Sequence, residues 1–312
     1  MPLLEPVGSL ARVFHDVLLA TALGEAVGLP VAMTGAADAP GILVDGLYAY
    51  GSVTEMTLLL AESIAENCGF NPKGYAEALA RLADVENPLR LYHPATAAAI
   101  TGIRRGEPWW KARIQLLQDG PRLDAAARAA PVALFYRSQR IAASMAEAQA
   151  LVTHSSSHDV EAARLYVVAL HQTLYRLDPG QLPLVLEDEA QDPLLRDLAA
   201  RLQDLAEEPP DRAARLLAPL PGGEPHPLAA ALYAYMRSPR DPLEAARAAA
   251  AMARGSADTA AAMAAALAAA YSGLQAVDKA VLGRLEAREW AREAAEKLYR
   301  ATVICHREEP RV

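Results

Sequence analysis

Apolar residues recur every three to four positions through most of the chain and almost nowhere alternate with polar ones. Leu60 and Ile64 show this spacing in one segment, and Met263 and Leu267 show it in another. The period is that of an α-helix, and the lack of alternation argues against strands. Short segments rich in proline and glycine divide the pattern into helices of ordinary length. We therefore predict an all-α fold, with residues 1–312 forming one compact multi-helix domain.

Charge and hydropathy narrow the range of partners. The chain has 30 Lys and Arg residues against 38 Asp and Glu residues, which gives a net charge of -8. This balance provides no drive toward a nucleic-acid backbone or an anionic membrane, so neither is expected as a partner. The most apolar later segment, "AAAMAAALAAAYSG", is shorter than the roughly 20 residues that span a bilayer. It is predicted to be a buried helix.

The two cysteines, Cys68 and Cys305, bear on the cellular compartment. They show no CxxC or Cys/His spacing, which argues against a zinc site and against a disulfide-built scaffold. The N-terminal segment has acids and a histidine inside its apolar stretch, unlike a signal peptide. Together these features favour a reducing cytoplasm.

The stretch "LGEAVGLP" contains Gly24 and Gly28 one helical turn apart, with Pro30 soon after. Two glycines at this spacing allow another backbone or a ligand to approach closely, and Glu25 between them is a candidate to contact a ligand. Close packing of a helix that ends at Pro30, with Glu25 in solvent, explains the same residues.

The stretch "YGSVTEMT" contains hydroxyl and carboxylate groups at the start of a helix. Thr54 and Glu55 have the hard oxygen ligands that suit magnesium or manganese. Ser52 and Glu55 also form an S-x-x-E capping box, which explains the same residues without any metal.

A second helix start of this kind occurs in "ARGSADTAAAM". Gly255 and Ser256 precede the helix, and Asp258 and Thr259 occupy its first turn, where an acid is favoured by the helix dipole. Capping again explains the pattern. In the functional interpretation, this start and the one at Thr54 form a shared oxygen-rich site.

The stretch "VTHSSSHDVEAA" contains His154 and His158 four residues apart. They either share a helix face as metal ligands or flank a serine-capped helix start. In the second interpretation, His154 lies before the helix and remains available to hydrogen-bond a ligand.

Taken in order, these stretches resemble the motifs of the ADP-ribosylglycohydrolase family over nearly the whole chain. The matching segments are "GEAVGLPVA", "TEMT" with the following "LLLAES", "YHPATAAAITGIRRGEPWW", the R-x-x-P element at Arg128–Pro131, Thr153–His154, and "GSADTAAAMAAALAAAYSG". The resemblance implies a compact all-α fold whose site is built from several helix starts. Enzymes of this family hold two magnesium or manganese ions and hydrolyse the glycosidic bond to an ADP-ribosyl group.

The resemblance also indicates which ligands this chain keeps. Thr54, Asp258 and Thr259 match family ligands, and Glu55 replaces an aspartate of the family motif. Three family acids are missing, and the residues at their positions are Ala32, Met56 and Ser256. Because hard dications are held largely by ligand charge and number, we expect at most one weakly held Mg²⁺ or Mn²⁺ ion, or none.

The expected function is therefore to hydrolyse or to recognise an ADP-ribosyl or related ribosyl group, either as an ADP-ribose-like small molecule or on an ADP-ribosylated protein. Glu55 and Asp258 are the expected catalytic groups, with Thr54, Glu55, Asp258 and Thr259 as metal ligands. Expected ligand contacts come from Glu25, Ser52, His154 and Ser256. The alternatives are a catalytically silent ADP-ribose or nucleotide-binding protein on the same fold, and a helical interaction scaffold.

Overall fold

The computed structural model describes residues 7–114, 123–219 and 223–306, and their regular secondary structure is almost entirely helical. The all-α class predicted from the apolar spacing is confirmed. The α-helices are α1 (Val7–Thr34), α2 (Ser52–Asn67), α3 (Pro72–Leu82), α4 (Pro94–Arg104), α5 (Trp109–Ala112), α6 (Asp124–Ala127), α7 (Ala130–Phe135), α8 (Gln139–Ala150), α9 (Ser157–Leu174), α10 (Leu182–Glu189), α11 (Pro193–Gln203), α12 (Pro210–Leu216), α13 (Pro227–Arg237), α14 (Pro242–Met252), α15 (Ala257–Ser272), α16 (Lys279–Gly283) and α17 (Arg288–Cys305). Short 3-10 helices occur at η1 (Pro88–Arg90), η2 (Pro179–Gln181) and η3 (Arg254–Ser256), and strands β1 (Leu43–Val44) and β2 (Leu47–Tyr48) form a small hairpin.

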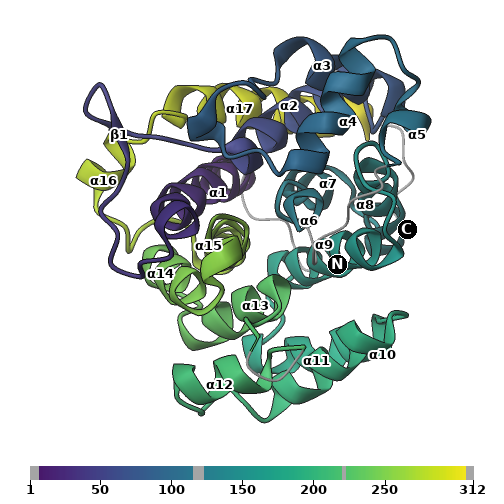
Figure 1. Ribbon diagram of the computed structural model, residues 1–312. Coiled ribbons are helices and arrows are strands. Elements are labelled where there is room, and N and C mark those ends of the chain that lie inside the picture. The colour runs from purple at the N-terminus through teal and green to yellow at the C-terminus, as the bar shows by residue number, and fades with distance from the viewer. Residues whose placement is uncertain (1–6, 115–122, 220–222, 307–312) are drawn as a thin grey trace.

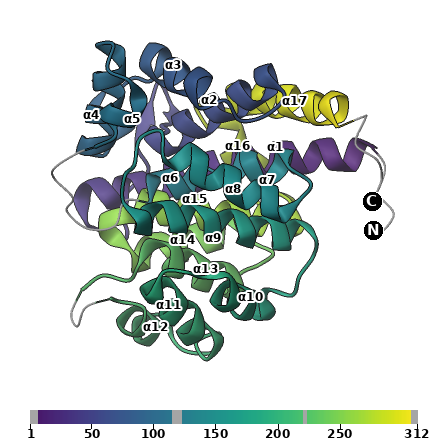
Figure 2. The same ribbon diagram turned by 90° about the vertical axis from the view of Figure 1, so that its right-hand side faces the viewer.

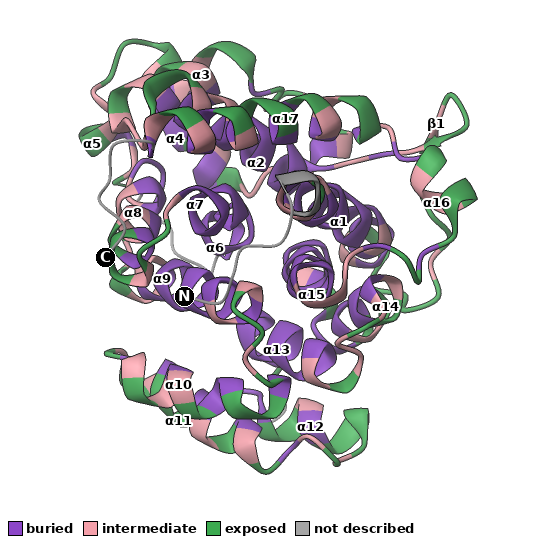
Figure 3. Ribbon diagram, turned by 180° about the vertical axis from the view of Figure 1, so that it is seen from behind, coloured by how far each residue is buried: buried purple, intermediate pink, exposed green. Residues whose placement is uncertain are grey.

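Helices α1 and α15 form the centre of the molecule. In Figure 1, α2 and α17 lie on one side of this pair, α13 and α14 on the other, and α6 to α9 beside it, with α10 to α12 farther out. Figure 2 shows the same arrangement from the side. Figure 3 shows that α1 and α15 are mostly buried, whereas α10 to α12 and α17 expose one face. The predicted burial of the alanine-rich helix is confirmed, because every residue from Ala257 to Ala270 is buried.

Two glycines allow α1 and α15 to pack at close range. A Cβ atom at Gly24 would lie 2.3 Å from the carbonyl oxygen of Ala261, and one at Gly28 would lie 2.1 Å from that of Ala257. Real Cβ atoms do not approach oxygens so closely, so only glycine fits at either position. Close backbone packing is therefore the use of these glycines.

The helix boundary predicted at Pro30 is wrong. Helix α1 continues through Pro30 to Thr34, and proline only removes the one hydrogen bond that its missing N–H would have donated. By length and composition, Leu10–Thr34 is apolar enough to cross a membrane, but 78% of its most apolar window is buried inside the protein. Core helices have this composition too, so the segment carries no conclusion about membranes.

The two cysteines pair with each other, which the sequence did not predict. A disulfide joins Cys68, at the C-terminal end of α2, to Cys305, at the end of α17. Their separation of 237 residues in sequence hides this proximity, which arises because α17 packs along α2. The cytoplasmic location, which rested partly on cysteine usage, stays a prediction.

Candidate functional site

The start of α2 is capped by a residue from another helix. The backbone N–H groups of Gly51, Val53 and Thr54 all donate to the carboxylate of Glu25, at 2.8, 2.7 and 2.9 Å. Gly51 is required for this approach, because a Cβ atom there would lie 2.6 Å from Glu25 Oε1. Glu25 is completely buried, so neither its placement in solvent nor a direct ligand contact fits the structure.

The capping box predicted for Ser52 and Glu55 is not formed. Gly51 is the N-cap residue and Ser52 is already the first residue of α2, so its hydroxyl does not cap the helix. Glu55 points elsewhere, accepting hydrogen bonds from the Asp84 N–H at 2.9 Å and from the Tyr92 hydroxyl at 2.5 Å. Burial raises the pKa of Glu55, and these two hydrogen bonds oppose the rise. Its oxygens therefore already have partners within the protein.

A buried cation lies beside the methionine of the "TEMT" motif. The Arg128 guanidinium is fully buried and donates from Nη1 to the sulfur of Met56 at 3.2 Å. It also donates to the side-chain oxygen of Gln149 at 2.8 Å and to the Gln149 carbonyl at 2.9 Å. The ring of Tyr75 lies 5.4 Å from the guanidinium carbon. A positive charge is thus fixed next to a position where the family motif has an acid.

The start of α15 supplies the second set of predicted residues. Helix α15 begins at Ala257, so Asp258 and Thr259 lie in its first turn as predicted. The Thr259 hydroxyl donates to the carbonyl of Ser256 at 2.9 Å. Burial raises the pKa of Asp258 to about 6, and the negative charge of Asp124 contributes to this rise. Asp258 is 8% exposed, whereas Glu25 is inaccessible.

His154 is paired with an acid that the sequence analysis missed. Its Nε2 atom lies 2.8 Å from Asp124 Oδ1, and the Thr96 hydroxyl donates to the other carboxylate oxygen at 2.6 Å. Burial alone would raise the pKa of Asp124, but His154, Arg128 and Thr96 together hold it well below its ordinary value. Asp124 lies outside every quoted motif, four residues before the R-x-x-P arginine, and this short distance was its only signal.

His158 does not share a site with His154. It contacts Asp192 at 3.0 Å and His226 at 3.0 Å, on the other side of the serine-capped start of α9. The metal-pair interpretation of these two histidines is therefore wrong. The interpretation as residues flanking a capped helix start is supported, because the Ser156 hydroxyl accepts from the Asp159 N–H.

The predicted residues converge from several helix starts. Burial raises the pKa of both Glu25 and Asp258, and the charge of Asp258 adds to the rise at Glu25 as that of Asp124 does at Asp258, so Asp258 lies within electrostatic range of the other two carboxyl groups. Thr54 lies beside Glu25 and is 1% exposed, and its hydroxyl makes no hydrogen bond of good geometry. Glu55 instead belongs to a neighbouring group with Tyr92. The start of α2, the start of α15 and the segment at Asp124 thus form the candidate site.

The residues at this site do not fit a divalent metal ion. Three amides occupy the Glu25 carboxylate, Glu55 is bound by Tyr92 and an amide, and Asp124 is bound by His154 and Thr96. No cluster of three or more His, Cys, Asp or Glu side chains able to hold a metal occurs in the described ranges. A metal needs several free anionic oxygens, and most of the carboxylates here already have partners within the protein.

The raised pKa of Asp258 predicts how stability depends on pH. Its pKa in the folded protein, about 6, is higher than the ordinary value of 3.8. As the pH rises from 3.8 to 6, the unfolded chain loses this proton before the folded protein does, so the free energy of unfolding falls. Asp258→Asn replaces the titrating carboxyl group with a neutral amide, so the variant does not lose stability over this pH range. The variant should therefore gain about 2 kcal/mol relative to the wild type between about pH 4 and pH 7.5. Urea unfolding of both proteins measures this gap, and a gap independent of pH would refute the assignment.

Comparison with known proteins adds three observations. A family model described as ADP-ribosylglycohydrolase matches residues 8–307. A solved structure described as an ADP-ribosylglycohydrolase-related protein complex is similar over 95% of this chain and 99% of that chain, with a TM-score of 0.70 and 26% identity. A protein of Archaeoglobus fulgidus, described as uncharacterized, is 32% identical over 170 residues, which are 50% of this chain and 54% of that protein. The chain thus matches about half the length of this curated relative.

Proposed function

Because this chain belongs to the ADP-ribosylglycohydrolase family, we propose that it recognises an ADP-ribosyl group, free or on a modified protein, without a divalent metal ion. The family acts on ADP-ribosylated substrates, and this chain keeps the helix starts that form the family's site. What it lacks is the set of free carboxylates that holds the ions. Recognition therefore fits its residues better than metal-assisted hydrolysis.

The observation that carries the proposal is Met56. Its thioether stands where the family motif has a carboxylate, and it accepts a hydrogen bond from the buried guanidinium of Arg128. A guanidinium carries a permanent positive charge and cannot be deprotonated in a protein. Because Arg128 belongs to the R-x-x-P element that this chain shares with the family, the missing acid at Met56, and not the arginine, separates this site from a metal-binding one.

A metal-free anion site would hold a phosphate with the free backbone amides of a helix start, and the start of α2 does not offer them. The first amides of α2 are saturated by Glu25, so they cannot hold a phosphate. The start of α15 remains, where Asp258 and Thr259 can bond to ribose hydroxyls and Ser256 is partly exposed. His154 contributes through Asp124, whose position it fixes. The ligand is thus recognised mainly through its hydroxyl groups.

A second candidate function, slow metal-free hydrolysis, rests on Asp258. Its raised pKa of about 6 suits a general base or acid near neutral pH. In this case the carboxylate would accept a proton from water as the water oxygen bonds to C1 of the ribose, and the proton would pass to the leaving group as the glycosidic bond breaks. Asp258 would then be needed for turnover as well as for binding.

Calorimetry with ADP-ribose tests the proposal. The wild type should bind, and Asp258→Asn should weaken binding about 10- to 100-fold, because a hydrogen bond to a charged group contributes roughly 1.5 to 3 kcal/mol. Asp188→Asn, which changes an exposed acid on α10, is the matched control and should bind as the wild type does.

A parallel assay separates the functions. Release of ADP-ribose from an ADP-ribosylated arginine peptide, followed with EDTA present, should be absent for the recognition protein. Release that Asp258→Asn abolishes would establish the second candidate. Absence of both binding and release would refute both and support a helical scaffold.

A further inference from the structure

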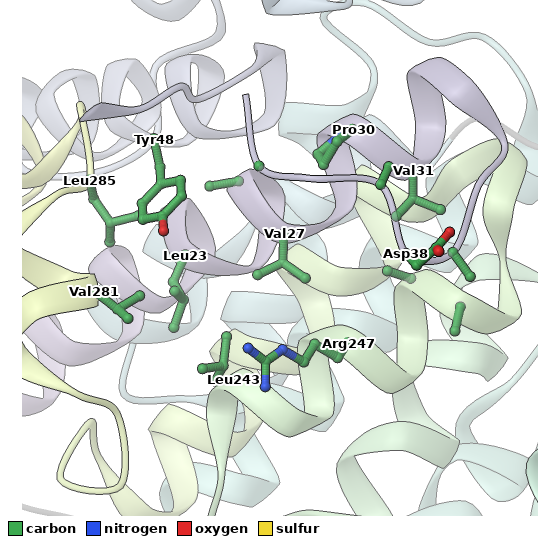
Figure 4. A pocket seen from close by; sticks show the side chains of 16 residues that line it. Leu23, Val27, Pro30, Val31, Asp38, Tyr48, Leu243, Arg247, Val281 and Leu285 are labelled. Carbon is green, nitrogen blue, oxygen red and sulfur yellow. The ribbon is translucent and has the colours of Figure 1, made fainter. Parts of the chain in front are cut away.

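A second pocket lies on the opposite face of α1 from Glu25. It has a volume of about 470 Å³ and lies between α1, α14 and the segments around Tyr48 and Leu285. Figure 4 shows Leu23 and Val27 of α1 facing Leu243 and Arg247 of α14 across it. Small-molecule sites have volumes of about 300 to 1,000 Å³ and mostly apolar walls. We name it the α1–α14 pocket.

The wall of this pocket around Tyr48 is held in place by the backbone. The Tyr48 N–H donates to the Arg284 carbonyl at 2.7 Å, and the Glu286 N–H donates to the Tyr48 carbonyl at 3.0 Å. The hairpin turn at Asp45 and Gly46 has positive φ at both residues, as a two-residue hairpin loop requires. Tyr48 is therefore fixed before any ligand arrives.

The segment at Gly41 passes close to the ring of Tyr48. A Cβ atom at Gly41 would lie 2.8 Å from this ring, so a larger side chain there would displace the ring or the segment. In Figure 4 the Tyr48 hydroxyl points into the space beside Leu23 and Val281. It is available as a hydrogen-bond donor to a ligand.

The pocket contains one cation that is free to bind a ligand. Arg247 is exposed and has no hydrogen-bond or ion-pair partner among the residues that the structure describes. The pocket's acid, Asp38, does not neutralise it, because the two side chains form no ion pair and point in different directions in Figure 4. The guanidinium and the Tyr48 hydroxyl thus face an apolar space as two donors.

We propose that the α1–α14 pocket binds an organic anion, a carboxylate or a phosphate monoester, that has an apolar body. The anionic group is bound by Arg247 and Tyr48, and the apolar body lies along Leu23, Leu243 and Val281. The positive charge of Arg247, which can only donate hydrogen bonds, favours an anionic group on the ligand. The rest of the wall has almost no hydrogen-bonding side chains, which favours an apolar body. A neutral alcohol accepts a hydrogen bond from the guanidinium but carries no negative charge to pair with it, and a cation is repelled.

This pocket is separate from the ADP-ribosyl site. Leu23, Ala26 and Val27 line it, whereas Glu25 and Gly28 on α1 contact the starts of α2 and α15. The proposal therefore stands or falls independently of the proposed function. The far-UV circular dichroism spectrum and urea unfolding serve as the check that a pocket variant is intact.

Calorimetry with octanoate, octyl phosphate and octanol tests the proposal on the full chain. We expect both anions, or one of them, to bind at least about tenfold tighter than octanol, because the alcohol forms no charged hydrogen bond. Which anion binds distinguishes the carboxylate source from the phosphate source. Equal binding of octanol, or no binding of either anion, would overturn the proposal.

Two variants locate the binding. Arg247→Gln should weaken anion binding at least about tenfold, while the matched Arg140→Gln, on an exposed part of α8, should leave it unchanged. Ala251→Trp fills the pocket from the exposed side of α14 and should abolish binding of the anion while leaving the circular dichroism spectrum that of the wild type. Unchanged anion affinity in Arg247→Gln would place the ligand elsewhere and refute the site.

Discussion

Replacing Glu25 by alanine should lower the free energy of unfolding by about 3 to 5 kcal/mol. Three backbone N–H groups at the start of α2 would lose their acceptor, and their surroundings are fully buried, so water cannot replace it. Each unsatisfied buried donor costs about 1 to 3 kcal/mol. Urea unfolding monitored by circular dichroism measures the loss.

Two further variants control this result. Glu25→Gln keeps the volume and one acceptor oxygen, so it should lose clearly less stability than the alanine variant. Glu66→Ala, an exposed position on the same helix α2, should stay within about 0.5 kcal/mol of the wild type. A loss below about 1 kcal/mol in Glu25→Ala would show that Glu25 does not cap α2.

Replacing Arg128 by methionine should also cost about 3 to 5 kcal/mol, because each buried acceptor left without a donor costs about 1 to 3 kcal/mol. The variant preserves the apolar volume, but it leaves the two Gln149 oxygens without donors and removes the cation that lowers the pKa of Asp124. Denaturation of this variant beside Arg140→Met, an exposed control, measures the effect. Equal stability of the two variants would contradict the role of Arg128.

Met56→Asp shows what Arg128 does to a restored acid. The new carboxylate would lie beside the guanidinium, which is 3.2 Å from the sulfur in the wild type, and should pair with it. Met56→Asp should therefore be less destabilising with Arg128 present than in Arg128→Met, with a coupling of about 1 kcal/mol or more in the double-mutant cycle. No coupling would show that the two side chains act independently.

Much of the fold could be predicted because its causes are local. Helical spacing identified the all-α class, and the alanine-rich segment was correctly predicted to be buried. The start of α15 at Asp258 also followed from local sequence. The helical spacing of apolar residues and the acids in the first turn of a helix depend on neighbours a few residues away, so both can be recognised in a single sequence.

The hydrogen-bond partners within the site could not be predicted, because they are distant from one another in sequence. Ser52 and Glu55 satisfied a local capping pattern, but the helix start is instead capped by Glu25, from another helix, which accepts from the N–H groups of Gly51, Val53 and Thr54. Asp124 is recognised as a site residue only in the folded protein, where His154 and Thr96 contact its carboxylate. The Cys68–Cys305 pair is hidden for the same reason.

Titration of ADP-ribose into the protein in EDTA and then in magnesium chloride tests the central claim, that the site works without a metal. Because Met56 stands where the family motif has an acid and the nearby carboxylates already have partners, the dissociation constant should agree within about twofold in the two buffers. Binding that is lost in EDTA and restored by Mg²⁺ would contradict the account.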